Sequence, residues 1–143
     1  MTSVLDTTAF AAAMRNDAEM VGFLRSRRPG DVATAPPVVA EIEYGIRRLD
    51  PSSGKRALLE GERDRMLGAI GVLPWTAEAS QEFGAIKASL ERSSELIDDF
   101  DIAIAAIAVA HGAEVISANL AHFRRVPGLS SRHWSDAAGP GEE

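Results

Sequence analysis

Short apolar runs alternate with longer stretches of helical spacing along the chain. The short runs, bounded by polar or turn residues, predict strands at 2–6, 31–35, 71–75 and 115–117, with a last edge strand near 132–134. Apolar residues three and four positions apart predict helices in between, at 9–14, 18–25, 38–49, 55–69, 76–93 and 99–110. This alternation is typical of an α/β sandwich with a mostly parallel sheet, whose ligand crevice lies at the carboxyl ends of the strands.

Capping signals place some of the boundaries between these elements. Thr7 and Thr8 are candidate N-caps for the first helix. Pro36 and Pro37 suit the first turn of the third helix, because proline is tolerated where no helical N–H bond is needed. The polar segment 119–122 is predicted as a loop.

Length and composition indicate one ordinary globular domain. The chain has 143 residues, of which 45% are hydrophobic and 25% charged, and a domain of this size buries roughly 68% of its unfolded surface. We expect a single domain over 1–136 and a loose tail over 137–143. The sequence contains no cysteine, so any metal would have to be bound by oxygen or imidazole ligands.

The chain is expected to be cytoplasmic. Its longest apolar run, 102–110, is far shorter than the roughly 20 residues that a membrane-spanning helix needs. The N-terminal segment carries an acid, Asp6, where a secretory signal would have basic residues.

A net charge of −6 counts against passive adhesion to nucleic acid. Acids that gather in one place would change this locally, because bound Mg²⁺ ions reverse the sign of the charge that a substrate meets. Clustered arginines could then bind the phosphates.

Four acids occupy positions that an ordinary core would avoid, namely Asp6, Glu41, Asp99 and Asp101. Asp6 follows a strand and, taken alone, is as well explained as a helix cap as a metal ligand. Asp99 and Asp101 open an apolar helix, where acids commonly complement the helix dipole. Glu41 lies within the apolar stretch of the third helix with Glu43 two positions on, so we expect one of the two to face inward and to need a cation. The alternative is a solvated helix face for both.

Carboxylates and waters are the ligands that Mg²⁺ and Mn²⁺ prefer, and phosphodiester hydrolysis is a reaction that such sites commonly serve. Other chemistries lack their signatures: the sequence has no GxGxxG, no GxxxxGK[ST] and no HExxH motif. A serine nucleophile would lack its glycine-flanked elbow.

Three segments resemble, in order and spacing, the signatures of the PIN-domain ribonucleases, and within them the VapC toxins of bacterial toxin–antitoxin pairs. The segments are VLDTTAF, AEIEYGI and DFDIAIAAIAVAHGAEVISANLAHFRRVPGL. The resemblance implies a PIN-like α/β/α sandwich and an endoribonuclease that uses Mg²⁺, with Mn²⁺ as a substitute. It also implies a cognate VapB-type antitoxin that neutralises the enzyme. We expect a homodimer as well, through a surface that the sequence does not identify.

Carried over by position, the resemblance makes Asp6, Glu41 and Asp101 the catalytic metal-site acids, with Asp99 as an additional candidate ligand. Two residues apart on a helix, Asp99 and Asp101 diverge, so both can bind metal only if Asp99 lies in the cap or the preceding loop. On the motif alone Asp101 is favoured.

The family often has a further acid after the next strand, and the segment 117–123 contains none. Asn119 could hold a metal-bound water or a phosphate through its amide, and His122 could do the same or be an exposed loop residue. Arg124 and Arg125 are candidate phosphate ligands, although solvation is the usual fate of such a pair.

Two other functions stay open. The missing loop acid is compatible with a catalytically silent relative that binds RNA or a protein through the same cleft. The alanine-rich helices at 9–14 and 102–110 could instead serve mainly for packing or dimerisation. No residue pattern predicts which RNA would be bound.

Overall fold

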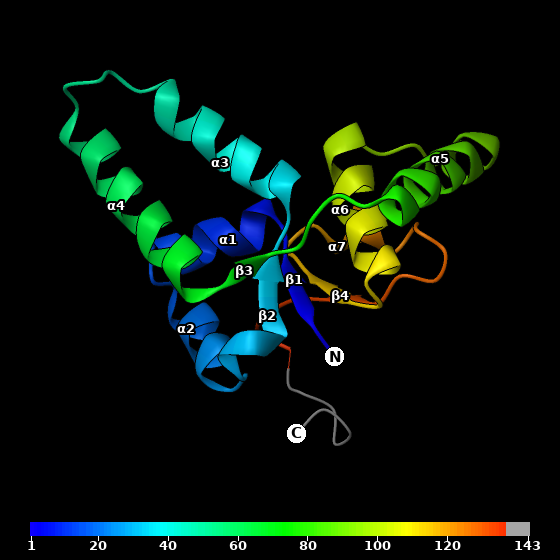
Figure 1. Cartoon of the computed structure of the whole chain (residues 1–143), viewed down its shortest axis with the longest axis horizontal. Coiled ribbons are helices and arrows are strands. Elements are labelled where there is room, and N and C mark those ends of the chain that lie inside the picture. The colour runs from blue at the N-terminus through cyan, green and yellow to red at the C-terminus, as the bar shows by residue number, and fades with distance from the viewer. Residues whose placement is uncertain (137–143) are drawn as a thin grey trace.

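The computed structural model describes residues 1–136, in which five short parallel strands form one sheet in the order β3-β2-β1-β4-β5 (Figure 1). The strands are β1 (Ser3–Leu5), β2 (Val32–Thr34), β3 (Gly71–Val72), β4 (Glu114–Ile116) and β5 (Ser131–Arg132). The central strand β1 pairs with β2 on one side and with β4 on the other. Beyond β2 the sheet continues to β3, and beyond β4 it continues to β5. The strand order therefore reverses at β1, which in open α/β sheets is the place where ligands bind.

Seven helices and one short 3₁₀ helix connect these strands. They are α1 (Thr7–Met14), α2 (Ala18–Arg25), η1 (Pro29–Asp31), α3 (Pro36–Arg47), α4 (Gly54–Ala69), α5 (Ala77–Arg92), α6 (Asp99–Ala110) and α7 (Leu120–Phe123). Figure 1 shows α3 and α4 as a helical hairpin on one side of the molecule, with α5 and α6 on the other. Helix α1 packs against both α3 and α4, and α3 also contacts α6.

The strand register brings the ends of three strands to one edge of the sheet. Leu5 is aligned with Ile116, and the N–H of Asp6 donates to the carbonyl of Ile116 at 3.1 Å. The residues directly after β1 and β4, Asp6 and Ser117, therefore lie side by side. The N-terminus of α3 follows β2 at the same edge, because β1 and β2 are parallel.

The core explains why α6 is so apolar. Ile102 and the run 104–108 have no exposed surface, and all three residues of β1 are equally buried. Alanine lets helices approach closely, and here it does so inside the chain's own core. Most residues of the alanine-rich segments 9–14 and 102–110 are therefore buried in the chain's own core.

The predicted α/β/α sandwich is confirmed, with boundaries that differ by a few residues. Helix α2 begins and ends at the predicted residues, Ala18 and Arg25. The predicted loop 119–122 is instead the short helix α7, because Phe123 is fully buried and holds it against the core. Thr7 and Thr8 are not the N-caps of α1, since the carboxylate of Asp6 accepts the N–H of Ala9 and caps it. The tail 137–143 lies outside the described residues.

A buried acid with cationic partners lies at the amino ends of the strands, at the opposite end of the sheet from Asp6. Glu114, the first residue of β4, accepts hydrogen bonds from Ser3 at 2.6 Å, from Arg132 at 3.0 Å and from Arg27 at 3.2 Å. Burial acts to raise the pKa of Glu114, but the hydrogen bonds from Ser3 and Arg132 and the positive charge of Arg132 bring the pKa below its ordinary value. The carboxylate of Glu114 is therefore ionised, and it links β1, β4, β5 and the segment after α2.

We expect Glu114→Gln to lower the free energy of unfolding by about 3–5 kcal/mol, because it leaves buried guanidinium charge without its partner. The measurement is urea unfolding near neutral pH. Because the folded-state pKa of Glu114 is depressed, the stabilising effect of its charge is lost as the pH falls through that pKa, so wild type and variant converge in acid. Asp64→Asn, at an ion pair whose acid is 70% exposed, is the control and should cost about 0–1 kcal/mol. Equal losses in the two variants would contradict the prediction.

Candidate metal centre

Asp6 is a buried carboxylate whose solvation is replaced by three hydrogen bonds. Its side chain follows the central strand and the residue is 2% exposed. Oδ1 accepts from the Thr8 hydroxyl at 2.6 Å and from the Ala9 N–H at 2.9 Å, and Oδ2 accepts from the Ser117 hydroxyl at 2.5 Å. Asp6 is therefore a helix cap, and the same geometry fixes its carboxylate at the edge where the strands end.

The two hydroxyls that hold Asp6 are themselves oriented by the backbone. Thr8 Oγ accepts the N–H of Ala118 at 2.9 Å, and Ser117 Oγ accepts the N–H of Asn119 at 2.7 Å. Each hydroxyl oxygen thus accepts a hydrogen bond from a backbone N–H, and each O–H group donates to Asp6. The sequence pattern did not single out Ser117; its only signal was a polar residue directly after a buried strand, at the same place as Asp6 relative to β1.

Glu41, and not Glu43, faces the other acids. Glu41 accepts a hydrogen bond from the Thr7 hydroxyl at 2.5 Å. Glu43 is instead bound by Arg47 and Arg63, each at 2.7 Å. The helix α3 thus presents one neutralised and one unneutralised glutamate.

Burial and the charges of neighbouring acids raise the pKa values of Asp6 and Glu41. Burial raises the pKa of Asp6, the negative charge of Asp101 adds to this, and the three hydrogen bonds oppose it. Burial also raises the pKa of Glu41, with further contributions from the charges of Asp101, Asp98 and Asp6. Among residues 1–136 no lysine or arginine forms an ion pair with Asp6, Glu41 or Asp101. We define these three residues as the acidic cluster.

Asp101 and Asp99 have different surroundings, as their separation on one helix implies. The Oδ2 atom of Asp101 lies 2.8 Å from Nδ1 of His122, and its side chain is 19% exposed. Asp99 is the first residue of α6 and forms an ion pair with Lys87 at 3.0 Å, with its side chain 60% exposed. The structure therefore brings Asp101 to the cluster and Asp99 to a lysine.

Asp98 is the neighbour that the motif did not identify. It caps α6 by accepting the N–H of Phe100 at 2.6 Å, and its charge acts on Glu41. The DFD motif contains only Asp99 and Asp101, on either side of Phe100. Asp98, the N-cap before them, is close enough for its charge to act on Glu41 of α3. A local signal existed, since Asp is a common N-cap, but it did not indicate a site.

The predicted substrate ligands fall into two groups. Asn119 lies beside the cluster, with its amide nitrogen 2.8 Å from Nδ1 of His122. Arg125 donates to the carbonyls of Glu95 and Leu96, at 3.4 and 3.3 Å, and so is held against the segment between α5 and α6. Arg124 is exposed.

The donor chemistry of the acidic cluster fits a hard cation. Within the part of the chain that the structure describes, no three His, Asp or Glu side chains form a ready-made cage for a metal ion. Mg²⁺ does not require one, because it usually keeps several waters and binds one or two carboxylates. Unneutralised carboxylates in mutual repulsion provide that kind of site, and a cation would relieve the repulsion.

Comparison with known proteins agrees with this arrangement. The profile of the PIN domain matches residues 3–129. Ribonuclease VapC2 of Haemophilus influenzae is 30% identical over 129 residues, covering 82% of this chain and 95% of that protein. The tRNA(fMet)-specific endonuclease VapC of Shigella flexneri is 27% identical over 132 residues, covering 92% of this chain and 97% of that protein.

Solved structures share the fold. The VapBC2 complex of Rickettsia felis bound to promoter DNA matches with a TM-score of 0.85 at 24% identity, covering 94% of this chain and 99% of the matched chain. The DNA-bound VapBC of Salmonella typhimurium gives 0.81 at 22% identity, covering 94% and 98%. The chain therefore belongs to the PIN-domain family, and the VapC-type resemblance predicted from its motifs is confirmed.

Cation binding should stabilise the fold more strongly as the pH rises. A cation competes with protons for Asp6 and Glu41, whose pKa values are raised, so binding weakens as the pH falls through those values. A concentration of Mn²⁺ about 100-fold above its dissociation constant would add about 2.7 kcal/mol. Thermal unfolding with Mn²⁺ or EDTA should therefore show a larger difference in Tm at about pH 8 than at about pH 5. A pH-independent difference would contradict the expected competition.

The same pKa shifts have the opposite effect without metal. A carboxylate whose folded-state pKa is raised stabilises the fold only while it is protonated, so in EDTA the charges of Asp6 and Glu41 destabilise it progressively as the pH rises. Glu41→Gln should therefore raise the Tm in EDTA at neutral pH and reduce the gain from Mn²⁺. A Tm in EDTA below that of wild type would count against this.

Proposed function

We propose that this chain is a Mg²⁺-dependent endoribonuclease toxin that hydrolyses RNA phosphodiester bonds at the acidic cluster. The observation that carries the proposal is the convergence of Asp6, Glu41 and Asp101 at the switch point of a PIN fold, where their charges are not balanced by lysine or arginine. RNA is chosen over DNA because the VapC relatives are named ribonucleases and a tRNA-specific endonuclease.

Each acid would have a distinct part in the reaction. A bound Mg²⁺ would activate water and stabilise the charge of the departing oxygen. Asp6, fixed by three donors, would be its rigid ligand, and Asp101 would approach from α6. Glu41 has one oxygen bound by Thr7 and a raised pKa, so its other oxygen is suited to accept a proton from the attacking water.

A second candidate function is a catalytically silent module that binds RNA or a protein. It is favoured by Asn119, which stands where the family often has a further acid. An amide can orient a water or a phosphate but adds no negative charge for a second cation. Binding without cleavage would be the property that distinguishes this module from the nuclease.

Cleavage of an RNA pool by the purified protein should require Mg²⁺ or Mn²⁺ and be abolished by EDTA. We expect Asp101→Asn to reduce the rate by more than about 100-fold, which exceeds the usual cost of losing an outer partner of a metal ligand. Asp99→Asn, two residues away and paired with Lys87, is the matched control and should retain activity. Cleavage in EDTA would refute the metal mechanism, and RNA binding without cleavage would favour the silent module.

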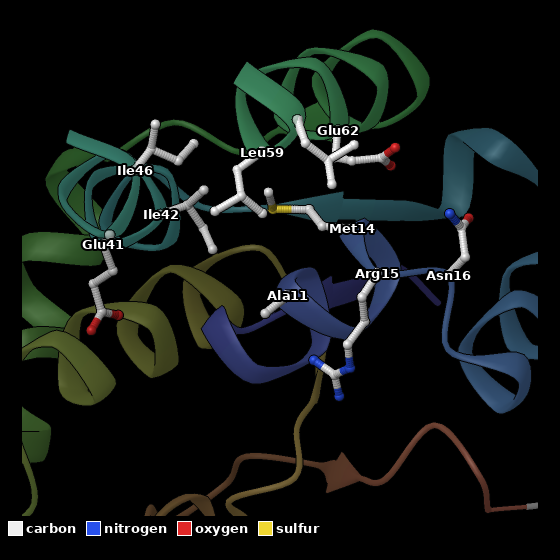
Figure 2. A pocket seen from close by; sticks show the side chains of 11 residues that line it. Ala11, Met14, Arg15, Asn16, Glu41, Ile42, Ile46, Leu59 and Glu62 are labelled. Atoms are coloured by element: carbon white, nitrogen blue, oxygen red, sulfur yellow. The ribbon is translucent and has the colours of Figure 1, made fainter. Parts of the chain in front are cut away.

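A VapB-type antitoxin is the partner that the family implies, and we propose that it binds in an apolar groove. A groove of about 610 Å³ lies between α1, α3 and α4. Figure 2 shows Met14, Ile42 and Leu59 converging there, with Glu41 at one end. An antitoxin segment with apolar side chains would fill the groove, and an Arg or Lys on the same segment would reach Glu41 and the acidic cluster and displace the cation.

Leu58→Glu should weaken binding of a cognate VapB-type antitoxin by at least about tenfold, or about 1.4 kcal/mol. Leu58 lines the groove but is 63% exposed, so the substitution leaves the core intact. The measurement is calorimetric titration, with Leu58→Met as the control that keeps the position apolar. RNA cleavage by the free Leu58→Glu protein should be unchanged. Undiminished binding would place the antitoxin elsewhere.

We also propose a cytoplasmic homodimer. Among the described residues no helix is long and apolar enough to cross a membrane. Exposed large apolar side chains at Tyr44, Trp75, Leu96 and Phe100 provide surface that a second copy could cover. A chain without cysteine is in keeping with a reducing compartment, where RNA substrates are also found.

A further inference from the structure

His122 joins two residues of the candidate metal centre through a single ring nitrogen. Its Nδ1 atom lies 2.8 Å from Oδ2 of Asp101 and 2.8 Å from the amide nitrogen of Asn119. An ionised carboxylate only accepts hydrogen bonds, so Nδ1 must carry a proton to bind Asp101. A protonated Nδ1 cannot also accept from the Asn119 NH₂ group. The amide is therefore turned so that its oxygen faces the ring, an exchange of O and N that hydrogen-bond networks decide.

We propose that His122 is a positioning residue that holds Asp101 for the cation, an inference that rests on the proposed metal-dependent function. The Nδ1–H group binds Oδ2 of Asp101, and Oδ1 makes no hydrogen bond within residues 1–136 and is left for the metal. The amide oxygen of Asn119 accepts from the same N–H group, which is shared in a three-centre hydrogen bond, and so helps to fix the ring. The amide of Asn119 at the N-cap of α7 and the imidazole of His122 within α7 lie in the segment in which the family often has an acid.

The other acids of the cluster show why such a partner is needed. Thr8 and Ser117 hold Asp6, and Thr7 holds Glu41. Asp101 has His122 as its only hydrogen-bond partner among the described side chains. Each carboxylate therefore has a donor of its own, and His122 does for Asp101 what the hydroxyls do for the other two. Outer-shell donors of this kind orient the ligand and raise metal affinity.

Two other histidines provide internal standards for the proton on His122. Nδ1 of His111 lies 2.9 Å from the carbonyl of Ile107, which only accepts, so this Nδ1 carries the proton. Nδ1 of His133 accepts the N–H of Ser135 at 3.0 Å, so its proton is on Nε2. The three rings of the chain thus include one reference of each tautomer.

The first test is the tautomer of His122 in the metal-free full chain. Long-range ¹H–¹⁵N correlation spectra, recorded where the imidazoles are neutral, distinguish the two tautomers. We expect His122 to show the pattern of His111. The pattern of His133 would overturn the proposal, because Nδ1 could not then donate to Asp101.

The second test is Mn²⁺ affinity by calorimetry in three substitutions at the same site. His122→Ala should weaken binding about 10–100-fold. His122→Asn places an amide N–H close to the position of Nδ1 and should restore most of the affinity. His122→Gln places its donor near the position of Nε2 and should behave as His122→Ala does. Unchanged affinity in His122→Ala, or equal loss in the Asn and Gln variants, would overturn the proposal.

These measurements separate the failure of this inference from the failure of the proposed function. If the wild-type chain binds Mn²⁺ but cleaves no RNA, the nuclease proposal fails and the order of the variants still decides the role of His122. If wild type cleaves RNA and His122→Ala binds Mn²⁺ as well as wild type does, only the positioning role fails. A wild-type chain that binds no Mn²⁺ overturns both. Unfolding curves of all variants check that the fold persists, as expected for a side chain that is 35% exposed.

Discussion

The burial of the Asp6 carboxylate at the end of the central strand is the constraint around which this end of the molecule is built. A buried ion is costly unless hydrogen bonds replace its hydration. Here one backbone N–H and two hydroxyls do so, and the hydroxyls are oriented by backbone groups of the segment after β4. The same bonds cap α1 and tie the β4 end to the start of that helix. The position of the Asp6 carboxylate and the stability of this end of the fold therefore depend on one set of contacts.

The buried acids at the two ends of the strands differ in whether a cationic side chain neutralises them. Glu114, at the amino edge, is neutralised by Arg27 and Arg132, which brings its pKa below the ordinary value. Asp6, at the carboxyl edge, is neutralised by no arginine, and the nearby charge of Asp101 helps to raise its pKa. A buried carboxylate with a built-in cation serves structure. One without it is hydrogen-bonded but keeps a charge that no side chain neutralises, and this is the charge that a bound cation would balance.

Helix α3 contributes Glu41 both to the acidic cluster and to the apolar groove proposed for the antitoxin. Glu41 belongs to the acidic cluster and also lines the apolar groove beside α1 and α4 (Figure 2). A partner that occupies the groove would therefore sit within reach of the same carboxylate that a cation needs. Inhibition by such a partner would need no conformational change in the nuclease, since competition for one charge is enough. The neighbouring Glu43 is already paired with Arg47 and Arg63 and takes no part.

Local patterning was sufficient for most elements, because strand and helix periodicity is encoded within a few neighbouring residues. Helix α2 was predicted to the residue, and the motifs identified Asp6, Glu41 and Asp101 as the acids to consider. Packing alone decided the rest. Ser117 reaches Asp6 across 111 positions of the chain, and His122 reaches Asp101 across 21. Phe123 turned an expected loop into a helix by entering the core. The motif alone already favoured Asp101 over Asp99, but only the tertiary structure shows their surroundings, with Asp101 beside His122 and Asp99 paired with Lys87.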